Sequence, residues 1–218
     1  MFIGHDAVAF ASKPAVFRTS LGTLVMAATF LDLIWPIFLL LGIEHVRVRG
    51  GSNPFLVLDF TDYPWTHSLV MSLAWSVAFG VVYWVATRYG RGALITGILV
   101  FSHWVLDYVT HVPDLPLTPT GATKVGLALW RSPAATIGVE AVIFATGIWM
   151  YARSTRARDR GGSISFVAFV FFLLLIYAAN FMSPPPNDAR AIAYVGLAGW
   201  LLPLWAWWFD RHREPIPS

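Results

Sequence analysis

Long apolar stretches separated by short polar connections dominate this chain. A helix needs roughly twenty apolar residues to cross the hydrocarbon core of a bilayer, and six stretches reach that length. They cover residues 21–43, 66–87, 92–112, 134–152, 164–182 and 190–209. The longest connections, 44–65 and 113–133, are too short to form a soluble domain. The pattern predicts an all-α, polytopic membrane protein whose residues 1–218 form a single membrane domain.

Composition supports this class and narrows the chemistry. The chain is 57% hydrophobic and 12% charged, and it contains 11 Trp and 16 Phe. Its net charge of +3 comes from basic residues in short loops, which form no continuous stripe, so we expect no nucleic-acid partner. Cysteine is absent, which leaves His, Asp and Glu as the strong metal ligands of the chain.

The distribution of Lys and Arg predicts the orientation. One set of connections holds Lys13, Arg18, Arg88, Arg91, Arg153, Arg156, Arg158, Arg160, Arg211 and Arg213, and the other holds Arg47, Arg49, Lys124, Arg131 and Arg190. Cytoplasmic loops carry the excess of basic residues, so both termini are expected to be cytoplasmic. The segment 2–11, upstream of Lys13 and Pro14, is then expected to be a short re-entrant or interfacial helix.

Three ionisable residues recur every four positions in the third stretch, namely His103, Asp107 and His111. This spacing places them on one face of a helix. Charged groups cost at least a few kcal/mol inside hydrocarbon, so their presence indicates a functional site. The alternative is that His103 and Asp107 form hydrogen bonds that pack helices together.

Other polar residues fall at matching depths. With about 1.5 Å of rise per residue, Asp32 lies roughly 16 Å and His103 roughly 17 Å from the cytoplasmic face. Glu140 lies roughly 9 Å below the outer face, close to Asp107 in depth, and His67 opens its span at that face. The inner halves of the spans are almost purely apolar. We therefore expect one cavity, open to the extracytoplasmic side or the outer leaflet.

Imidazole and carboxylate groups are the usual ligands of catalytic zinc, which keeps an open position for water. His103 and Asp107, four residues apart on a helix, can share an ion. His111 lies about 12 Å along the axis from His103, so we expect it at a second ion, behind the ligands or at the interface.

The residues Gly4-His5, Asp32, Thr66-His67-Ser68, Ser102-His103 and Asp107, in this order, resemble the YdjM/YbcI-like membrane-bound metal-dependent hydrolases. The similarity covers roughly residues 1–120, the metal-site half, whereas the additional spans at about 134–209 carry no family motif. The resemblance implies a bacterial-type inner-membrane protein. It also implies a metal site, with zinc as the expected ion, formed by His5, Asp32, His67, His103 and Asp107. If the N-terminal segment only floats at the interface, His5 is not a ligand.

The chain departs from the family pattern twice. Leu31-Asp32-Leu33-Ile34 keeps one acid where the family often has Pro-Asp-x-Asp. The family often has His-Arg-Gly-x-Thr-His-Ser, whereas this chain has Asp62-Tyr63-Pro64-Trp65-Thr66-His67-Ser68. Asp62 therefore takes the place of a His, and the Arg that might hold an anionic substrate group is missing.

These observations predict a metal-dependent hydrolase of an ester or phosphoester in a membrane lipid or lipid-linked small molecule, acting at the extracytoplasmic face. Glu140 or Asp62 is the expected general base for water activated by the metal. One alternative is a proton- or metal-coupled transporter, because midplane acids and histidines also form ion relays. Another is a non-catalytic membrane protein with a structural metal.

Overall fold

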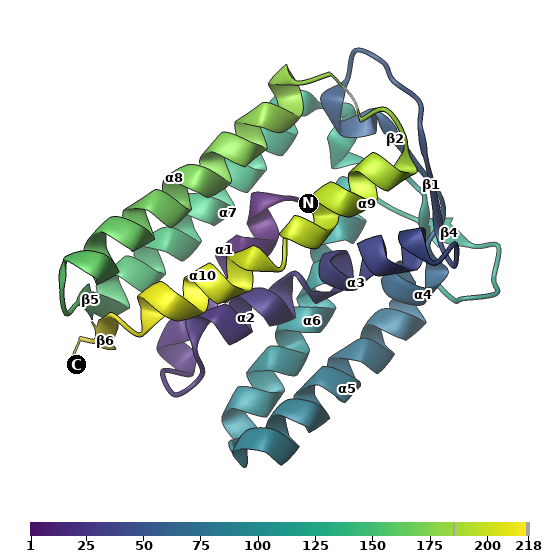
Figure 1. Ribbon diagram of the computed structural model, residues 1–218. Helices are drawn as coiled ribbons and strands as arrows, with labels where there is room; N and C mark the ends of the chain where they lie inside the picture. The colour runs from purple at the N-terminus through teal and green to yellow at the C-terminus, as the bar shows by residue number, and fades with distance from the viewer. Residues whose placement is uncertain (185, 217–218) are drawn as a thin grey trace.

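The structure is a computed structural model that describes residues 1–184 and 186–216, and it is mostly helical (Figure 1). The α-helices of this part of the chain are α1 (Ile3–Ser12), α2 (Leu21–Ala28), α3 (Phe30–Leu40), α4 (Pro64–His67), α5 (Leu69–Thr87), α6 (Gly90–Thr110), α7 (Pro133–Ser154), α8 (Arg160–Met182), α9 (Ala189–Ala198) and α10 (Leu201–Asp210). Short 3-10 helices occupy Lys13–Ala15, Pro54–Leu56 and Leu129–Arg131. Side-chain N-caps start several of the long helices, including Ser68 for α5, Ser132 for α7 and Asp159 for α8.

The predicted spans correspond to the long helices. Within the described residues, five helical segments are long and apolar enough to cross a membrane: α5, α6, α7, α8 and the combined α9 and α10. The pair α2 and α3 makes a sixth span if it is counted as one, but it bends by 56°. The fold is therefore consistent with the expected all-α membrane protein, and the first span is broken instead of straight.

The break between α2 and α3 lies at Thr29. Its backbone leaves the helical region at φ −103° and ψ 9°, and its hydroxyl donates to the Val25 carbonyl at 2.9 Å. Such a local hydrogen bond competes with the helical ladder and bends helices. The consequence for the site is that the carbonyl of Ala28 lies at a helix end, where it is free to accept a side-chain hydrogen bond.

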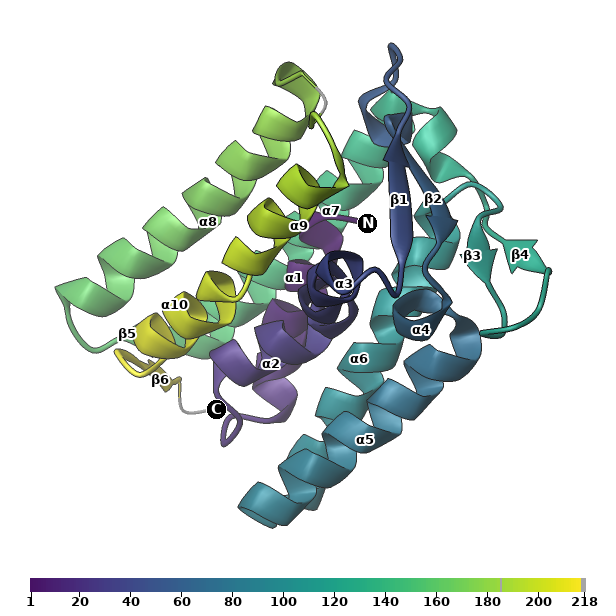
Figure 2. The ribbon, with the colours of Figure 1, turned by 45° about the vertical axis from the view of Figure 1, so that its right-hand side comes forward.

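Helix α1 lies inside the bundle, surrounded by α2, α6 and α7 (Figures 1 and 2). Ile3, Ala7 and Phe10 are buried, and α1 packs most extensively against α7. A Cβ on Gly147 would lie 2.3 Å from the Ala7 carbonyl oxygen, so the close approach of α1 and α7 requires glycine there. The interfacial alternative for segment 2–11 is therefore wrong, since the helix has neighbours on its sides. The metal-site half and the additional spans share one core.

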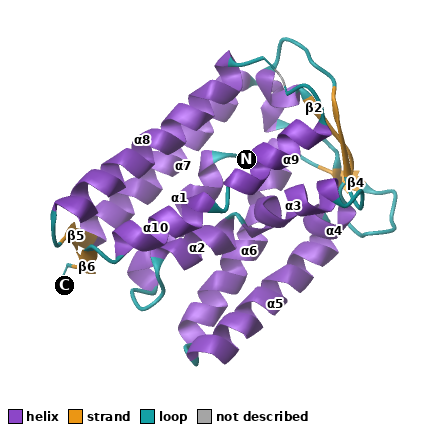
Figure 3. Cartoon of the chain, in the orientation of Figure 1, coloured by secondary structure: helices purple, strands orange, loops and turns teal. Residues whose placement is uncertain are grey.

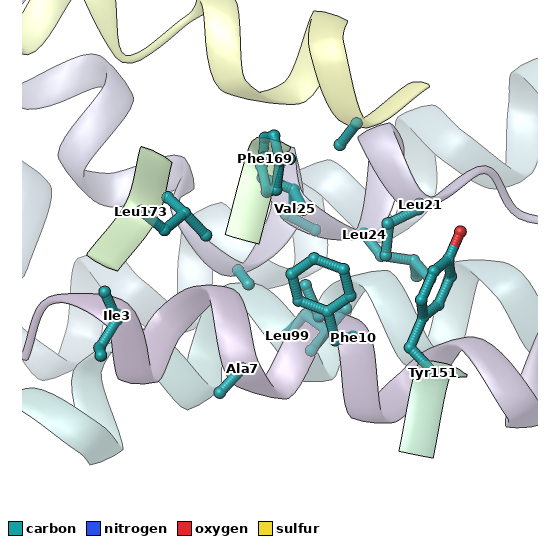
Figure 4. Close-up of a cluster of buried hydrophobic side chains, with 14 of the residues drawn as sticks. Ile3, Ala7, Phe10, Leu21, Leu24, Val25, Leu99, Tyr151, Phe169 and Leu173 are labelled. Carbon is teal, nitrogen blue, oxygen red and sulfur yellow. The ribbon is translucent and has the colours of Figure 1, made fainter. Parts of the chain in front are cut away.

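The core between α1, α2, α6, α7 and α8 is a cluster of buried hydrophobic side chains (Figure 4). We call it the apolar cluster; its labelled members are Ile3, Ala7, Phe10, Leu21, Leu24, Val25, Leu99, Tyr151, Phe169 and Leu173. Each of these side chains is at most 4% exposed. Lipid covers no part of such a cluster, so packing between helices holds it together.

Short antiparallel strand pairs lie at two ends of the bundle (Figure 3). At the hairpin end, β1 (His45–Val48) pairs with β2 (Leu58–Asp62), and β3 (Leu115–Pro116) pairs with β4 (Lys124–Val125). At the basic end, β5 (Thr155–Ala157) pairs with β6 (Arg213–Pro215). The basic end also holds the buried ion pair of Lys13 with Asp210, 2.6 Å apart. The loop before α2 and the end of α10 are thus on the same side.

Reporter fusions test which end faces the cytoplasm. A fusion after Arg158, at the basic end, should report a cytoplasmic position, and a fusion after Lys124, at the hairpin end, should report the opposite side. The reason is the excess of Lys and Arg at the basic end. Two reporters on one side would contradict both the orientation and the span assignment.

Candidate metal centre

His103 and Asp107 face each other one turn apart on α6. His103 Nε2 and Asp107 Oδ2 are 3.2 Å apart, and both side chains are buried. The helix runs without interruption from Gly90 to Thr110, so the four-residue spacing in the sequence gives this contact directly.

Asp32 and His67 approach the same point from α3 and α4. Asp32 Oδ1 lies 3.6 Å from His103 Nε2 and 3.5 Å from His67 Nε2, and His67 Nε2 lies 3.9 Å from Asp107 Oδ2. The bend at Thr29 and the end of α4 at Ser68 bring the two helix segments to α6. The structure thus gathers four of the residues singled out in the sequence, and the depth estimate for Asp32 and His103 agrees with their contact.

The donor spacing is compatible with a shared ion. Asp32, His67 and His103 offer ligand atoms that all lie within 4.8 Å of one another, and Asp107 Oδ2 lies 3.2 Å from His103 Nε2 and 3.9 Å from His67 Nε2. The side chain of Asp32 is 48% exposed, whereas those of the other three donors are at most 5% exposed. Asp32 is therefore the member of this group that lies at the surface of the protein.

His5, on α1, joins the group at the other oxygen of Asp107. Its Nε2 lies 3.1 Å from Asp107 Oδ1, and the backbone nitrogen of Met1 contacts the same oxygen. The His5 ring stacks on the His103 ring with centroids 3.7 Å apart and planes 2° from parallel. His5 reaches Asp107 because α1 is buried in the bundle. This position is the one expected if segment 2–11 enters the bundle as a re-entrant helix.

Neighbouring groups fix how His103 and His67 present their nitrogens. His103 Nδ1 lies 2.9 Å from the Ala28 carbonyl oxygen, which can only accept, so Nδ1 carries the proton. Thr66 donates its hydroxyl to Glu44 Oε2 at 2.7 Å and accepts from His67 Nδ1 at 2.6 Å. Both rings therefore turn an unprotonated Nε2 toward the carboxylates when they are neutral.

The surroundings of His103 Nε2 indicate whether a cation fits among the donors. His103 Nε2 is buried and has no hydrogen-bond partner among residues 1–184 and 186–216, although two carboxylate oxygens lie within 3.6 Å. A neutral imidazole lone pair repels carboxylate oxygens, so the contact is favourable only with a positive charge there. Either a divalent cation bound by the group or a proton on His103 would supply this positive charge. The set of imidazole and carboxylate donors is one that a divalent cation such as zinc prefers.

Glu140, one of the two expected bases, lies at the start of α1. Its Oε2 accepts hydrogen bonds from the backbone nitrogens of Phe2 at 2.9 Å and Gly4 at 3.2 Å. The carboxylate therefore caps the N-terminus of α1, where backbone N–H groups lack helical partners. Glu140 thus holds the helix that carries His5, while its role as a base stays a prediction.

Asp62, the other expected base, lies on the surface of the hairpin end. The register of β1 and β2 pairs it with His45, and its Oδ2 lies 3.3 Å from His45 Nδ1. Its side chain is 54% exposed. The strand that carries Asp62 thus pairs it with His45 at the surface, and its role as a base stays a prediction.

Sequence reasoning missed Glu44. It is buried, and besides Thr66 Oγ1 it accepts from the backbone nitrogens of Trp65 at 2.7 Å and Thr66 at 2.8 Å. Burial raises the pKa of the Glu44 carboxyl, while the hydrogen bonds from Thr66 and Trp65 oppose that shift. No short motif joins Glu44 to Thr66, because the β1–β2 hairpin between them makes the contact.

Asp114, which follows α6, contacts His111. Its Oδ1 lies 2.9 Å from His111 Nδ1 and accepts from the Tyr63 hydroxyl at 3.1 Å. Burial and Asp114 raise the pKa of Tyr63 well above its usual value, so Tyr63 stays a neutral donor. The spacing of three residues between His111 and Asp114 is the sequence feature that could have predicted this contact.

Thr66→Val tests the role of the Glu44–Thr66 relay. The change keeps the shape of the side chain but removes the hydrogen bond that orients His67. Loss of such a partner typically lowers metal affinity about 10–100-fold, and we expect a decrease of that size for zinc. Competition with a chromophoric chelator measures it, and Thr66→Ser should restore most of the affinity. Equal affinities of Thr66→Val and the parent protein would show that the relay does not position a ligand.

Comparisons with protein-family models, with curated proteins and with solved structures give no match, so the family resemblance of residues 1–120 stays a prediction.

Proposed function

We propose that the chain is a membrane-embedded, metal-dependent hydrolase of an ester or phosphoester. The observation that carries the proposal is the group formed by Asp32, His67, His103 and Asp107, with an unpartnered, buried His103 Nε2 among carboxylate oxygens. The resemblance of residues 1–120 to membrane-bound metal-dependent hydrolases supports the same function.

Asp32, His67, His103 and Asp107 are the residues that would hold the ion, with zinc as the expected metal. Such an ion polarises the carbonyl or phosphoryl group of a substrate and makes water more acidic. The surrounding residues keep the ligands in place: Ala28 and Thr66 orient the two imidazoles, and Glu44 orients Thr66.

We assign the role of general base to Asp32, whose side chain is the most exposed of the four donors. Its Oδ1 faces His67 and His103, so this oxygen would bind the ion. We assign to its other oxygen the orientation of the attacking water and the acceptance of its proton. Glu140 is held by backbone nitrogens at the start of α1, and Asp62 pairs with His45.

The packing of the bundle favours a site with one opening. The apolar cluster extends from Ala28, whose carbonyl contacts His103, to Tyr151, which is labelled in Figure 4. Tyr151 donates to Asp210 at the basic end, at 2.8 Å. A hydrolytic site needs one entrance, whereas alternating access needs a path to each side. With the orientation predicted from the basic residues, the entrance is on the extracytoplasmic side or in the outer leaflet, where a lipid or lipid-linked substrate is present.

One observation favours a transporter as the second candidate. Asp6 is buried next to His5, and its Oδ1 has no hydrogen-bond partner within the described part of the chain. A buried acid on the inner side of a His/Asp group is a feature of proton relays. A transporter would move protons or metal ions along α1, past Asp6.

Hydrolysis by purified protein tests the proposal. Zinc-loaded protein in detergent should cleave a chromogenic phosphodiester or ester analogue, and chelation should abolish the reaction. Asp32→Asn should lower the rate about 100-fold or more, because it removes the carboxylate that both binds the ion and accepts the proton, while it keeps the shape of the side chain. Asp159→Asn, at the basic end, is the matched control and should leave the rate unchanged. If the protein cleaves no analogue but conducts protons or zinc into sealed vesicles, and Asp6→Asn stops this, the transporter is correct.

A further inference from the structure

Asp107 presents its two oxygens to two different pairs of histidines. Its Oδ2 faces His103 at 3.2 Å and His67 at 3.9 Å, whereas its Oδ1 faces His5 at 3.1 Å and His111 at 3.9 Å. A carboxylate flanked in this way has the arrangement of a bridge between two cations. The first pair belongs to the metal centre described above, and the second pair has no role there.

His103 cannot serve cations on both sides. Two groups of residues have ligand atoms close enough for an ion, one with Asp32, His67 and His103 and the other with His5, His103 and Asp107. His103 belongs to both, but the Ala28 carbonyl occupies its Nδ1, which leaves a single nitrogen for an ion. For both positions to hold an ion, one of the two groups must use a different ligand.

The stacking of His5 and His103 leads to the same conclusion. A metal ion lies close to the plane of the imidazole that binds it, since the nitrogen lone pair is in that plane. The two ring planes are 2° from parallel with centroids 3.7 Å apart, so a single ion cannot lie near both planes. His5 and His103 are thus placed for different ions.

We take His111 as the ligand that replaces His103 at the second position, because its Nε2 faces the same oxygen of Asp107 as His5 does. The imidazoles of His5 and His111 have to move closer together to share an ion. Asp114 lies at the Nδ1 of His111, which leaves Nε2 directed to Asp107 Oδ1. A carboxylate behind a histidine is the arrangement that orients metal-binding imidazoles and raises their basicity. His111 is 4% exposed, and its ring packs 4.0 Å from that of Trp130.

We propose a second divalent-cation position formed by His5, His111 and Asp107 Oδ1, with Asp107 bridging the two ions. The Met1 nitrogen lies at the same oxygen, so an ion there displaces it or is bound by it. The inference rests on the proposed function and favours a phosphoester over a carboxylic ester as the substrate. Two-metal sites stabilise both the attacking and the leaving oxygen of a displacement at phosphorus.

Metal stoichiometry with Mn²⁺ tests this proposal without an activity assay. Metal-free protein loaded with Mn²⁺ and desalted should retain two ions per chain and give the exchange-coupled paramagnetic resonance signal of a pair. His111→Gln should retain one ion and give the signal of isolated Mn²⁺. Inorganic phosphate should alter the coupled signal of the parent protein but not the signal of His111→Gln. His45→Gln, which changes an exposed histidine at the hairpin end, is the matched control and should behave like the parent protein.

Asp114→Asn covers the case in which His111→Gln does not fold. It keeps the ligand and removes only the supporting carboxylate, so the second ion should bind about 10–100-fold more weakly while the first is unaffected. One tightly bound ion in the parent protein, unchanged in both variants, would overturn the second position and leave the proposed function intact. No bound ion at all would overturn both.

Discussion

Replacing His103 by alanine is expected to remove tight zinc binding. Loss of a partner that only orients a ligand costs about 10–100-fold in affinity, so loss of a ligand should cost more than about 100-fold. His103 contributes the nitrogen that faces both Asp32 and Asp107, which makes it the least replaceable of the donors. Competition with a chromophoric chelator in detergent measures the change.

His45→Ala is the control for the His103 variant. His45 is 60% exposed and pairs with Asp62, so its removal tests for nonspecific binding of zinc to imidazole. Size-exclusion chromatography and circular dichroism establish that both variants remain folded. An affinity of His103→Ala within tenfold of the parent value would show that His103 is not a ligand.

Asp210→Ala is expected to produce the largest loss of stability. Asp210 accepts hydrogen bonds from Lys13 at 2.6 Å, the backbone nitrogen of Leu21 at 2.9 Å and the Tyr151 hydroxyl at 2.8 Å. The side chains of Lys13 and Asp210 are each 7% exposed. Removing one partner of a buried ion pair leaves the other charge uncompensated, which costs about 3–5 kcal/mol.

Unfolding of the detergent-solubilised protein by denaturant measures this loss. Glu214→Ala is the matched control at the same end of the bundle, because Glu214 pairs with Arg156 and Arg158 on the surface. Its removal should change the free energy of unfolding little, since exposed ion pairs contribute little. Equal effects of the two changes would contradict the view that Asp210 anchors α1, α2, α7 and α10 together.

The hydrophobic pattern was sufficient to predict the long helices, because each apolar stretch must satisfy its own backbone groups in lipid. It was not sufficient for the first and last spans, each of which is broken into two helices. The bend at Thr29 depends on a local hydrogen bond, which hydropathy does not report. The burial of α1 depends on α7, more than 120 residues away, so segment 2–11 alone was compatible with both a buried and an interfacial position.

The candidate site was predictable where it depends on helix geometry. His103 and Asp107 share a helix, and the depth of Asp32 follows from its distance along the first span. Tertiary contacts determined the rest. The register of β1 and β2 pairs Asp62 with His45, and Glu140 accepts hydrogen bonds from the backbone of Phe2 and Gly4 at the start of α1.

X-ray absorption at the zinc edge tests the central claim most directly. The account predicts that zinc-loaded protein has a first shell of nitrogen and oxygen donors at about 2.0–2.2 Å, with scattering from imidazole rings that decreases in His67→Ala. A protein that retains no zinc after desalting, or whose zinc shows oxygen neighbours without imidazole, would contradict the account.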